Sequence, residues 1–425
     1  MKKTYNIDVH HLRRVEGHGD IHIKVKNGKL IDSKWSIVET PRFFESMLQG
    51  LSYEIAPALT SRICGICSIG HTLASLRATE NAMGVKIPKD AEIIRLLAKH
   101  GETIQSHMLH VFFLAAPDFL NVGSVIPLIT THPDLVKMAA RLKGLGNDIC
   151  DVVAGRRVHP VRLITGGVTM APSKKELEEL KTKINQGIED IMATAELFRT
   201  LKMPDFVRET EFVALKGKKG CYPWIGGDLI STDGVVKKED AYLAMTNEYT
   251  VEFSNAKMTK LSRKSFAVGA LARINNNYKF LEQDARHMAE VLGLAPVCHN
   301  PFMNTVAQIV ECYHIMLESL TMIDRLLDSK LNKLRSKFTP KAGRGVGAVE
   351  VPRGILYHEY TLDSKGTVKK ANCIIPTTQN NANIHHDMSE LVVQELESGR
   401  DDTDIEQICK MLVRAYDPCI SCSVH

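Results

Sequence analysis

The sequence lacks most of the features that would place it in a simple class of protein. It has no long run of like charge: 54 basic and 49 acidic residues are spread over 425 positions and leave a net charge of +5, which argues against a nucleic-acid partner. The N-terminus has no apolar segment that could serve as a secretory signal. The most apolar stretch, residues 110–128, contains His110, Pro117 and Asp118 and is too polar to cross a bilayer. We therefore expect a cytoplasmic protein with no direct membrane span.

Cysteine is also scarce. Ten cysteines are too few to form a disulfide scaffold in a chain of this length. Six stand alone, and we expect each of them to be a small buried hydrophobic residue: Cys150, Cys221, Cys298, Cys312, Cys373 and Cys409. The other four form two C-x-x-C pairs, Cys64 with Cys67 and Cys419 with Cys422. These pairs need a separate explanation.

Hydrophobic periodicity predicts a small sheet followed by long helices. Between residues 21 and 37, apolar and polar residues alternate on either side of Asn27-Gly28, a dipeptide typical of two-residue hairpin turns. Ser173-x-x-Glu176 is a capping box, and an apolar residue follows it at every third or fourth position as far as Phe198. Further helical patterns cover residues 302–327, 91–115, 133–153 and 401–416.

The fold class that follows is mainly α with a small β portion (α+β), a long-helix bundle core with a small N-terminal sheet. Glycine and basic residues accumulate in residues 216–234 and 341–354, where we expect loops. No repeat or flexible linker divides the chain. We therefore expect one domain over residues 1–425, which consists of the hairpin and first cysteine pair (1–86), a helical body (87–340) and C-terminal active-site segments (341–425).

The two cysteine pairs indicate a metal site. The sulfurs of a C-x-x-C turn converge on one side of a tight loop, and thiolates are soft ligands that suit zinc, iron–sulfur clusters, copper or nickel. The pairs lie near opposite ends of the chain, whereas a zinc ribbon spaces them about 15–20 residues apart. Neither pair has the third nearby cysteine of a ferredoxin run, and neither follows a strand as a thioredoxin-like pair does. The alternative interpretation is that one pair forms a structural zinc knuckle.

The segments around these cysteines resemble the first and last signatures of the large, catalytic subunits of nickel–iron (NiFe) hydrogenases. Four other segments resemble the family in the same order along the chain. The resembling segments are Arg14 to His18, Pro41 to Glu45, Arg62 to His71, Val351 to Gly354, Ile375 to Thr378 and Asp417 to His425. The details of residues 38–45 and 416–422 are most similar to cytosolic multi-subunit hydrogenases, namely the sulfhydrogenase type, the heterodisulfide-reductase-linked type and NAD(P)-linked or bifurcating assemblies.

The resemblance implies reversible heterolytic cleavage of H2 to protons and electrons at a nickel–iron site. Cys64 and Cys419 would be terminal ligands of nickel. Cys67 and Cys422 would bridge nickel to iron, and the iron would carry CO and cyanide ligands.

The resemblance also implies roles for the residues around the metals. His71 would donate a hydrogen bond to a bridging sulfur, and Arg353 would lie over the open face of the metals, fixed by Asp417. Glu16 would pass protons from the Cys419 sulfur. The iron ligands would be enclosed by Pro352, Pro376 and Thr377. A magnesium-type divalent ion would be held by Glu45, the carbonyl of Cys373 and His425.

One position departs from the family pattern. Many relatives have an aspartate that pairs with the active-site arginine at the place where this chain has Ser106, so we expect less negative charge around Arg353. Relatives also carry a C-terminal extension that a maturation endopeptidase removes after the final histidine, and a chain ending at His425 fits the mature form.

The sequence has no cysteine run for an iron–sulfur cluster of its own, so the resemblance implies an iron–sulfur small subunit and further flavin or iron–sulfur electron-transfer subunits. Two alternatives are a scaffold like the related subunit of respiratory complex I, which lacks the four cysteines, and a zinc-stapled structural protein. The resemblance also implies that the physiological electron acceptor binds in other chains.

Overall fold

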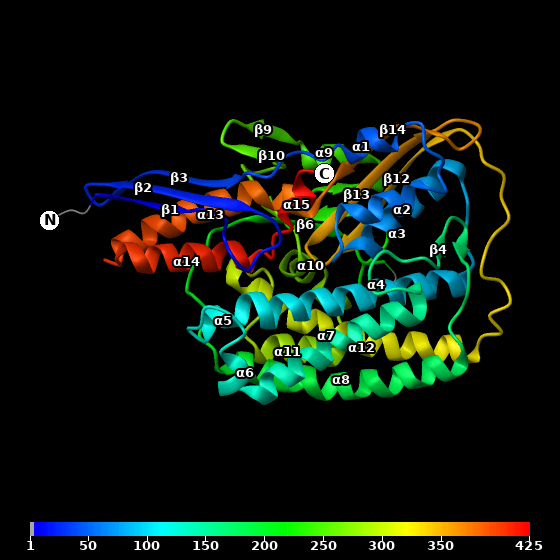
Figure 1. Cartoon of the computed structure of the whole chain (residues 1–425), viewed down its shortest axis with the longest axis horizontal. Coiled ribbons are helices and arrows are strands. Elements are labelled where there is room, and N and C mark those ends of the chain that lie inside the picture. Colours follow the sequence, from blue (N-terminus) through cyan, green and yellow to red (C-terminus); the bar gives the residue numbers. More distant parts are fainter. Residues whose placement is uncertain (1–3, 219) are drawn as a thin grey trace.

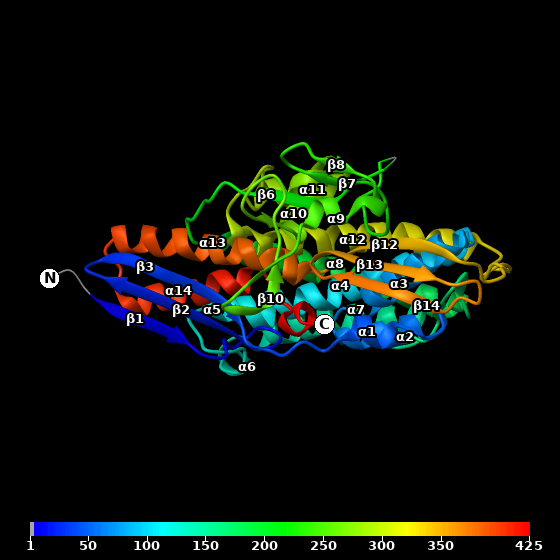
Figure 2. The same ribbon diagram turned by 90° about the horizontal axis from the view of Figure 1, so that it is seen from above.

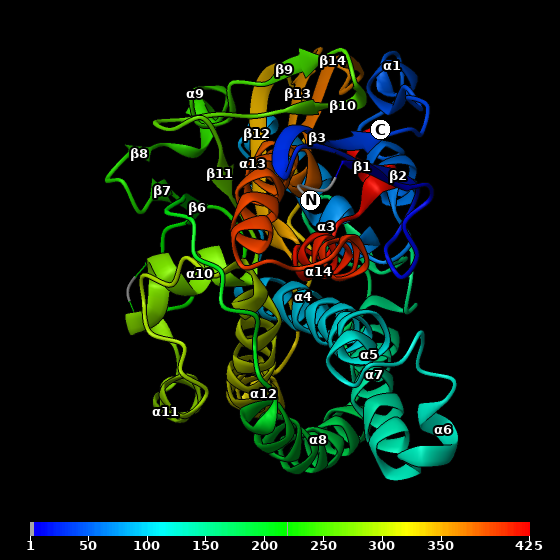
Figure 3. The same cartoon turned by 90° about the vertical axis from the view of Figure 1, so that its left-hand side faces the viewer.

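The computed structural model describes residues 4–218 and 220–425 and has an elongated body rich in helices (Figure 1). Long helices form one layer, and the sheets with the remaining helices form another (Figures 1 and 3). The main hydrophobic core draws buried residues from Ile7 near the N-terminus to Val424 near the C-terminus. The expected class, mainly helical with small sheets, is confirmed. No helix among the described residues is both long and apolar enough to cross a membrane.

The N-terminal sheet contains the expected hairpin. Strands β2 (Gly19–Lys26) and β3 (Lys29–Ile37) pair antiparallel. Asn27 and Gly28 between them both have positive φ, 54° and 70°, which suits a type I′ turn. A third strand, β1 (Tyr5–Val9), which the sequence analysis missed, pairs with β2. Figure 2 shows this sheet extended beside α13 (Pro376–Glu397) and α14 (Asp402–Ala415).

The helical layer confirms the periodic patterns. Its members α4 (Lys89–Leu109), α7 (Pro133–Ala154), α8 (Lys174–Thr200) and α12 (Asn304–Asp328) pack against one another. Helix α8 begins at the predicted cap, where Ser173 and Glu176 form a reciprocal capping box. The pattern over residues 91–115 does not stay α-helical to its end: after α4 the chain continues in a π-helical turn, His110–Ala115.

The prediction of a loop at residues 341–354 is wrong. Strands β12 (Gly343–Val351) and β13 (Gly354–Leu362) form a hairpin there, and β14 (Val368–Ile374) completes a three-stranded antiparallel sheet. The glycines that suggested a loop instead let β12 lie close to α3 (Ser68–Met83), because a Cβ on any of three alternate glycines would lie 2.0–2.2 Å from a carbonyl oxygen of that helix. The pairs are Gly343 with Ala82, Gly345 with Ala78 and Gly347 with Ala74.

The remaining elements are short and connect these layers. The loop expected at residues 216–234 is largely present in its described part but includes the strand β7. Two lone cysteines in connecting segments are not buried as expected: Cys221 is exposed and Cys298 is half-buried. The short elements are α1 (Phe44–Leu48), α2 (Ala56–Thr60), α5 (Ala116–Phe119), α6 (Leu128–Thr131), α9 (Leu243–Thr246), α10 (Ala270–Asn277), α11 (Gln283–Val291), α15 (Ile420–Ser423), β4 (Leu163–Ile164), β5 (Gly167–Val168), β6 (Glu211–Leu215), β7 (Leu229–Ser231), β8 (Val236–Lys237), β9 (Tyr249–Val251), β10 (Ser254–Met258) and β11 (Phe266–Ala267).

Candidate metal centre

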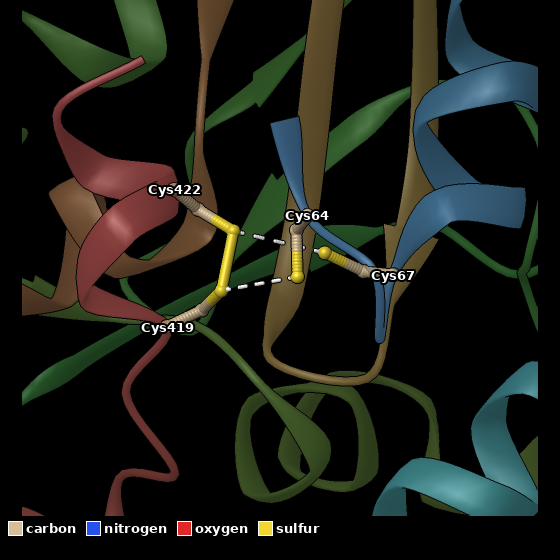
Figure 4. Close-up of side chains that lie close together, drawn as sticks. All are labelled: Cys64, Cys67, Cys419 and Cys422. Atoms are coloured by element: carbon tan, nitrogen blue, oxygen red, sulfur yellow. Dashed lines mark hydrogen bonds between the residues drawn. A yellow bond between two sulfur atoms is a disulfide. The ribbon is translucent and has the colours of Figure 1, made fainter. Parts of the chain in front are cut away.

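The two cysteine pairs meet in the core. Cys64 and Cys67 lie on the turn before α3, and Cys419 and Cys422 lie at and within α15, the last helix of the chain. All four are buried, and their Sγ atoms lie within 4.8 Å of one another. Figure 4 shows the side chains pointing toward a common centre, with Sγ–Sγ distances of 3.4 Å from Cys419 to Cys64 and 3.8 Å from Cys67 to Cys422. Cys419 and Cys422 are joined by a disulfide, so the state that binds metal through four thiolates is the reduced one.

Backbone contacts hold the C-terminal segment against the first pair. The N–H of Ile420 donates to the carbonyl of Glu16 at 2.9 Å. Arg42 donates its backbone N–H to the carbonyl of Val424 at 2.8 Å, and its guanidinium donates both to the carbonyl of Ile63 at 2.8 Å and to that of Ser421. Arg42 lies in the Pro41 to Glu45 motif, but the sequence alone predicted no role for it.

Thr377 has a second role that sequence reasoning missed. Its hydroxyl oxygen accepts a hydrogen bond from the backbone N–H of Cys419 at 2.9 Å. Because Thr377 lies at the start of α13, this bond ties the first cysteine of the second pair to the N-terminus of a long helix. The position of the Cys419 sulfur therefore depends on a side chain from another part of the chain.

The thiols of the first pair differ in acidity. A hydrogen bond from Cys67 lowers the pKa of Cys64, with help from the cationic Arg353. The same hydrogen bond raises the pKa of Cys67 well above its usual value, and burial adds to the effect. Cys64 is therefore the thiol of this pair that ionises first, which is the form that ligates a metal.

A small enclosed cavity adjoins the sulfurs. All nine of its lining residues lie in the sequence motifs: seven were predicted as site residues, and Val351 and Ile375 complete its apolar wall. Pro352, expected in this wall, is absent from the lining formed by the described residues; its carbonyl instead accepts a hydrogen bond from Arg273 at 3.2 Å. The lining residues are Cys67, His71, Val351, Arg353, Ile375, Pro376, Thr377, Cys419 and Cys422.

Arg353 is a buried cation at this cavity. Its Nε donates to the backbone carbonyl of Asp417 at 2.6 Å and its Nη2 donates to the carboxylate at 2.9 Å. Burial alone would lower the pKa of Arg353, but Asp417 and the thiols of Cys64 and Cys67 raise it overall, so the guanidinium stays charged. Its Nη1 is buried with no hydrogen-bond partner. Four buried sulfurs and an unpaired donor beside one cavity fit a metal centre that carries ligands able to accept a hydrogen bond.

Glu16 lies at the edge of the centre and is half-buried rather than fully buried. Residue 16 forms a parallel bridge with Cys419. Its carboxylate accepts hydrogen bonds from the backbone N–H of Ser421, at 3.1 Å, and from the Ser421 hydroxyl. Glu16 is thus the carboxylate that connects the C-terminal cysteine segment to the outer part of the protein.

Three groups expected at a divalent ion come together near the C-terminus. The Nε2 atom of His425 lies 2.9 Å from the carbonyl oxygen of Cys373 and 3.6 Å from a carboxylate oxygen of Glu45. Burial acts to raise the pKa of Glu45, but hydrogen bonds with His425 and with the Cys373 amide lower it overall. Two oxygens and an imidazole nitrogen at these distances fit a hard divalent cation such as Mg²⁺ with water completing its shell.

Ser106 and His71 complete the set of predicted residues. Ser106 is buried in α4, and its hydroxyl has no hydrogen-bond partner among the described residues. It supplies no charge to Arg353, whose carboxylate partner in the described residues is Asp417. His71 is buried on α3 at the cavity, and its Nδ1 lies 3.1 Å from Nε2 of His358, a residue that sequence reasoning missed.

Comparison with known proteins identifies the same segments. The family described as nickel-dependent hydrogenase matches residues 42–144 and 219–425. The chain is 32% identical to sulfhydrogenase 2 subunit alpha of Pyrococcus furiosus, over 99% of this chain and 98% of the relative. It is 28% identical to NAD-reducing hydrogenase HoxS subunit beta of Cupriavidus necator, over 97% and 93%. A crystal structure of an NAD+-reducing NiFe hydrogenase superposes with a TM-score of 0.89 at 26% identity, covering 99% of both chains.

Proposed function

Because this chain belongs to the nickel-dependent hydrogenase family and is an oxidoreductase that cleaves H2 at a nickel–iron site, we propose how its residues divide that work. The observation that carries the proposal is the convergence of four buried Sγ atoms within 4.8 Å from opposite ends of the chain. Cys64 and Cys419 would be terminal ligands of nickel, and Cys67 and Cys422 would bridge nickel to iron.

The metal centre, with CO and cyanide on iron, would supply the Lewis acid that polarises H2. The protein contributes a fixed cation and a wall that excludes water. Arg353 would hold its unpaired Nη1 toward the ligands of the centre, with its direction set by Asp417. Thr377 and Pro376 line the same cavity and would wall the iron ligands, together with Pro352, the residue before Arg353.

Proton movement would use Glu16. Its carboxylate touches the segment that carries the Cys419 and Cys422 sulfurs, through the N–H and hydroxyl of Ser421. A half-buried carboxylate in this position can accept a proton released at a thiolate and deliver it outward. His71, at the cavity wall, would donate a hydrogen bond to a bridging sulfur and so adjust its electron density.

A divalent ion, Mg²⁺ or similar, would be held by Glu45, the Cys373 carbonyl and His425. Such an ion would tie the C-terminal residue to α1 and β14 and would hold α15, with its two cysteines, in place. The close approach of the three groups supports this role, because a chain terminus otherwise frays.

Electrons would leave through a partner. Within residues 4–218 and 220–425, the four cysteines are the one group of three or more His, Cys, Asp or Glu side chains placed to hold a metal, and we propose that electrons pass from it to an iron–sulfur cluster of another chain. We propose an iron–sulfur small subunit on the face around α1 and α2, supported by exposed apolar side chains there, including Phe43 at 66% exposure, Ile55 at 52% and Met47 at 45%. Flavin or iron–sulfur subunits would extend the electron path, and a maturation endopeptidase would act during assembly.

Location and domain organisation belong to the same proposal. We place the protein in the cytoplasm, where the four cysteine thiols would stay reduced until the metals bind. We also treat residues 1–425 as one domain, because segments 1–86, 87–340 and 341–425 contribute to a common core and the first and last of them supply the metal ligands.

Elemental analysis and infrared spectroscopy of the purified protein test the proposal. Nickel and iron near one atom each per chain, with bands from iron-bound CO and cyanide, are expected. Zinc alone would instead indicate a structural staple, and the absence of bound metal would indicate a scaffold. Either result would refute the assignment of the four cysteines to a nickel–iron centre.

A further inference from the structure

A fully buried arginine on α10 donates to the backbone of the two residues that precede Arg353. The guanidinium of Arg273 donates through Nη1 to the carbonyl of Val351 at 2.9 Å and through Nη2 to that of Pro352 at 3.2 Å. A guanidinium stays protonated in proteins and has no acceptor atom, so the direction of both bonds is fixed. Arg273 has no part in the proposed function, and the sequence alone predicted no role for it.

Two glutamates from other elements hold this guanidinium in place. Nε and Nη2 of Arg273 donate to the two carboxylate oxygens of Glu311 on α12, each at 2.7 Å. Nη1 also donates to Glu350 on β12, at 3.1 Å. Glu311 is itself fixed, because it accepts from the Tyr222 hydroxyl at 2.6 Å and lies 2.9 Å from Nε2 of His107. All of these side chains are buried, and a doubly bonded pair of this kind leaves the arginine little freedom to move.

The turn that carries Arg353 has a shape that needs support. Pro352 and Arg353 are the two residues between β12 and β13, because Val351 pairs with Gly354. Two-residue hairpin turns favour types I′ and II′, which have positive φ at the first turn residue and match the twist of the strands. Neither Pro352 nor Arg353 has positive φ, and the proline ring cannot adopt it. The shape of this turn therefore depends on contacts from outside the hairpin.

Helix α10 contacts the same turn at its N-terminus. Gly269, the residue before the helix, lies so close that a Cβ on it would be 3.4 Å from the carbonyl oxygen of Arg353. The N–H of Arg273 donates to the carbonyl of Gly269 at 2.9 Å, so the guanidinium belongs to the next turn of the same helix. Asp417 thus holds the side chain of Arg353, whereas α10 lies against the backbone of its turn.

We propose that Arg273 is a positioning residue for Arg353, which it orients by fixing the carbonyls of Val351 and Pro352. The inference rests on the proposed function, in which Arg353 holds its unpaired Nη1 toward the ligands of the metal centre. Such a donor must be placed closely, because a misplacement of about 1 Å can cost about 100-fold in rate. Asp417 fixes the end of the Arg353 side chain, and Arg273 fixes the backbone from which that side chain starts.

The chain contains a matched control for the test. Arg95 is also a buried arginine that donates to both carboxylate oxygens of a glutamate, Glu80, and to two backbone carbonyls, those of Ile164 and Gly167. These carbonyls belong to the β4–β5 pair, which is outside the set of residues that line the cavity. Arg95→Lys and Arg273→Lys each keep one buried charge and lose one fork of donors. Only the second change acts on the turn between β12 and β13.

The first measurement is hydrogen exchange of the peptide that covers residues 350–355, read by mass spectrometry on the purified proteins. We expect faster exchange in Arg273→Lys and wild-type exchange in Arg95→Lys, because a lysine cannot pair with Glu311 and also donate to both carbonyls. The second is the infrared spectrum, in which the bands of iron-bound CO and cyanide should shift in Arg273→Lys alone. With nickel and iron retained, kcat for H2 oxidation should fall by about 10- to 100-fold in that variant.

A double variant separates positioning from a general structural role. If Arg273 acts through Arg353, then Arg273→Lys should cost little in a protein that already carries Arg353→Lys. The double variant should be about as slow as Arg353→Lys alone, whereas a general structural role would slow both backgrounds by the same factor. Glu350→Gln removes the charge that meets Nη1 of Arg273 but can still accept from the N–H of Leu215. It should show the same pattern with a smaller loss.

Each other outcome overturns the inference or the proposed function. Wild-type exchange of the peptide in Arg273→Lys would overturn the inference, as would equal rate losses in Arg273→Lys and Arg95→Lys, or losses that multiply in the double variant. Loss of nickel from Arg273→Lys would also overturn it, because the arginine would then be needed to hold the metals. If Arg273→Lys does not fold, Glu350→Gln decides by the same measurements, and wild-type exchange, bands and rate would overturn the inference. A wild type without nickel and iron would refute the proposed function itself, and the exchange measurement, which needs no metal, separates the two failures.

Discussion

Arg353 and Asp417 form a buried ion pair in which Asp417 accepts from the arginine twice, through its carboxylate at 2.9 Å and its backbone carbonyl at 2.6 Å. The two bonds use Nη2 and Nε and fix the plane of the guanidinium. The third nitrogen, Nη1, is left without a partner. The pair therefore joins the turn between β12 and β13 to the segment that precedes Cys419, and leaves one donor of a cavity-lining residue unpaired.

Arg353→Lys should keep the metals but lose most of the activity. A lysine preserves the positive charge but cannot make both bonds to Asp417 and still present a third donor. We expect H2 oxidation to fall by about 100-fold or more, the usual cost of removing one fixed donor from an active site. Arg95→Lys is the control, because Arg95 is a buried arginine paired with Glu80 away from the sulfurs. Comparable rates in the two variants would contradict the role of Arg353.

Cys419→Ser and Cys422→Ser should each abolish nickel retention, because a serine hydroxyl does not replace a soft thiolate ligand. Metal content by elemental analysis is the measurement. Cys409→Ser is the matched control: Cys409 is buried on α14 outside the cluster, and burial raises the pKa of its thiol so that it stays protonated. Normal nickel content in Cys419→Ser would disprove the ligand assignment.

Glu16→Gln should leave nickel and iron in place and slow turnover by about 100-fold, since a positioned acid–base group contributes 10²–10⁴-fold. The amide has nearly the same shape as the carboxylate and can still accept from the N–H of Ser421. The rate of H2 oxidation is measured beside Glu196→Gln, which alters an exposed carboxylate paired with Arg199 on α8. A Glu16→Gln enzyme as fast as the Glu196→Gln enzyme would exclude Glu16 from proton transfer.

Added Mg²⁺ should stabilise the protein after chelation. A ligand that binds the folded chain at 100 times its Kd adds about 2.7 kcal/mol of stability, and this should appear as a higher thermal midpoint. Glu45→Gln should remove most of the effect, because the amide is a weaker ligand for a divalent cation than the carboxylate is. The same Mg²⁺-dependent rise in Glu45→Gln and wild type would place the ion elsewhere.

Stability should fall in acid because of buried neutral histidines. Burial lowers the pKa of His107 and of His314 to about 4, whereas both would titrate near 6.5 when unfolded. The unfolded chain thus binds more protons between pH 6.5 and 4, so the stability from each residue is complete above pH 6.5 and is lost as the pH falls, by about 1.4 kcal/mol per pH unit. Denaturant unfolding at pH 7.0 and 5.5 measures this, and His314→Gln should reduce the slope. An unchanged slope would show that His314 titrates normally.

Local patterns predicted the elements well where the signal lies within one segment. The capping box at Ser173, the apolar face of α12 and the Asn27-Gly28 turn each depend on residues within a few positions of one another. The expectation failed at residues 341–354, where the sequence showed many glycines and the structure shows strand β12. Those glycines do not serve flexibility: they allow a strand to approach a helix that lies far away in the sequence.

Residue types predict the chemistry of the site. Two C-x-x-C pairs and the Arg353 segment specify soft ligands and a cation, His425 predicts a second ion site, and the order of these segments along the chain indicates the family. Residue type is enough for this prediction, because a thiolate prefers soft metals and a guanidinium prefers oxygen acceptors at any position in a chain.

Which of these groups meet depends on how the whole chain packs. The fold joins the sulfurs of Cys64 and Cys419 at 3.4 Å, uses Arg42 and Thr377 to hold the C-terminal segment, and places His358 beside His71. These contacts link residues separated by 42 to 379 positions. Such partners meet because α3, β13, α13 and α15 pack on a common core. The hydrophobic periodicity of a single segment does not indicate which distant segment it packs against.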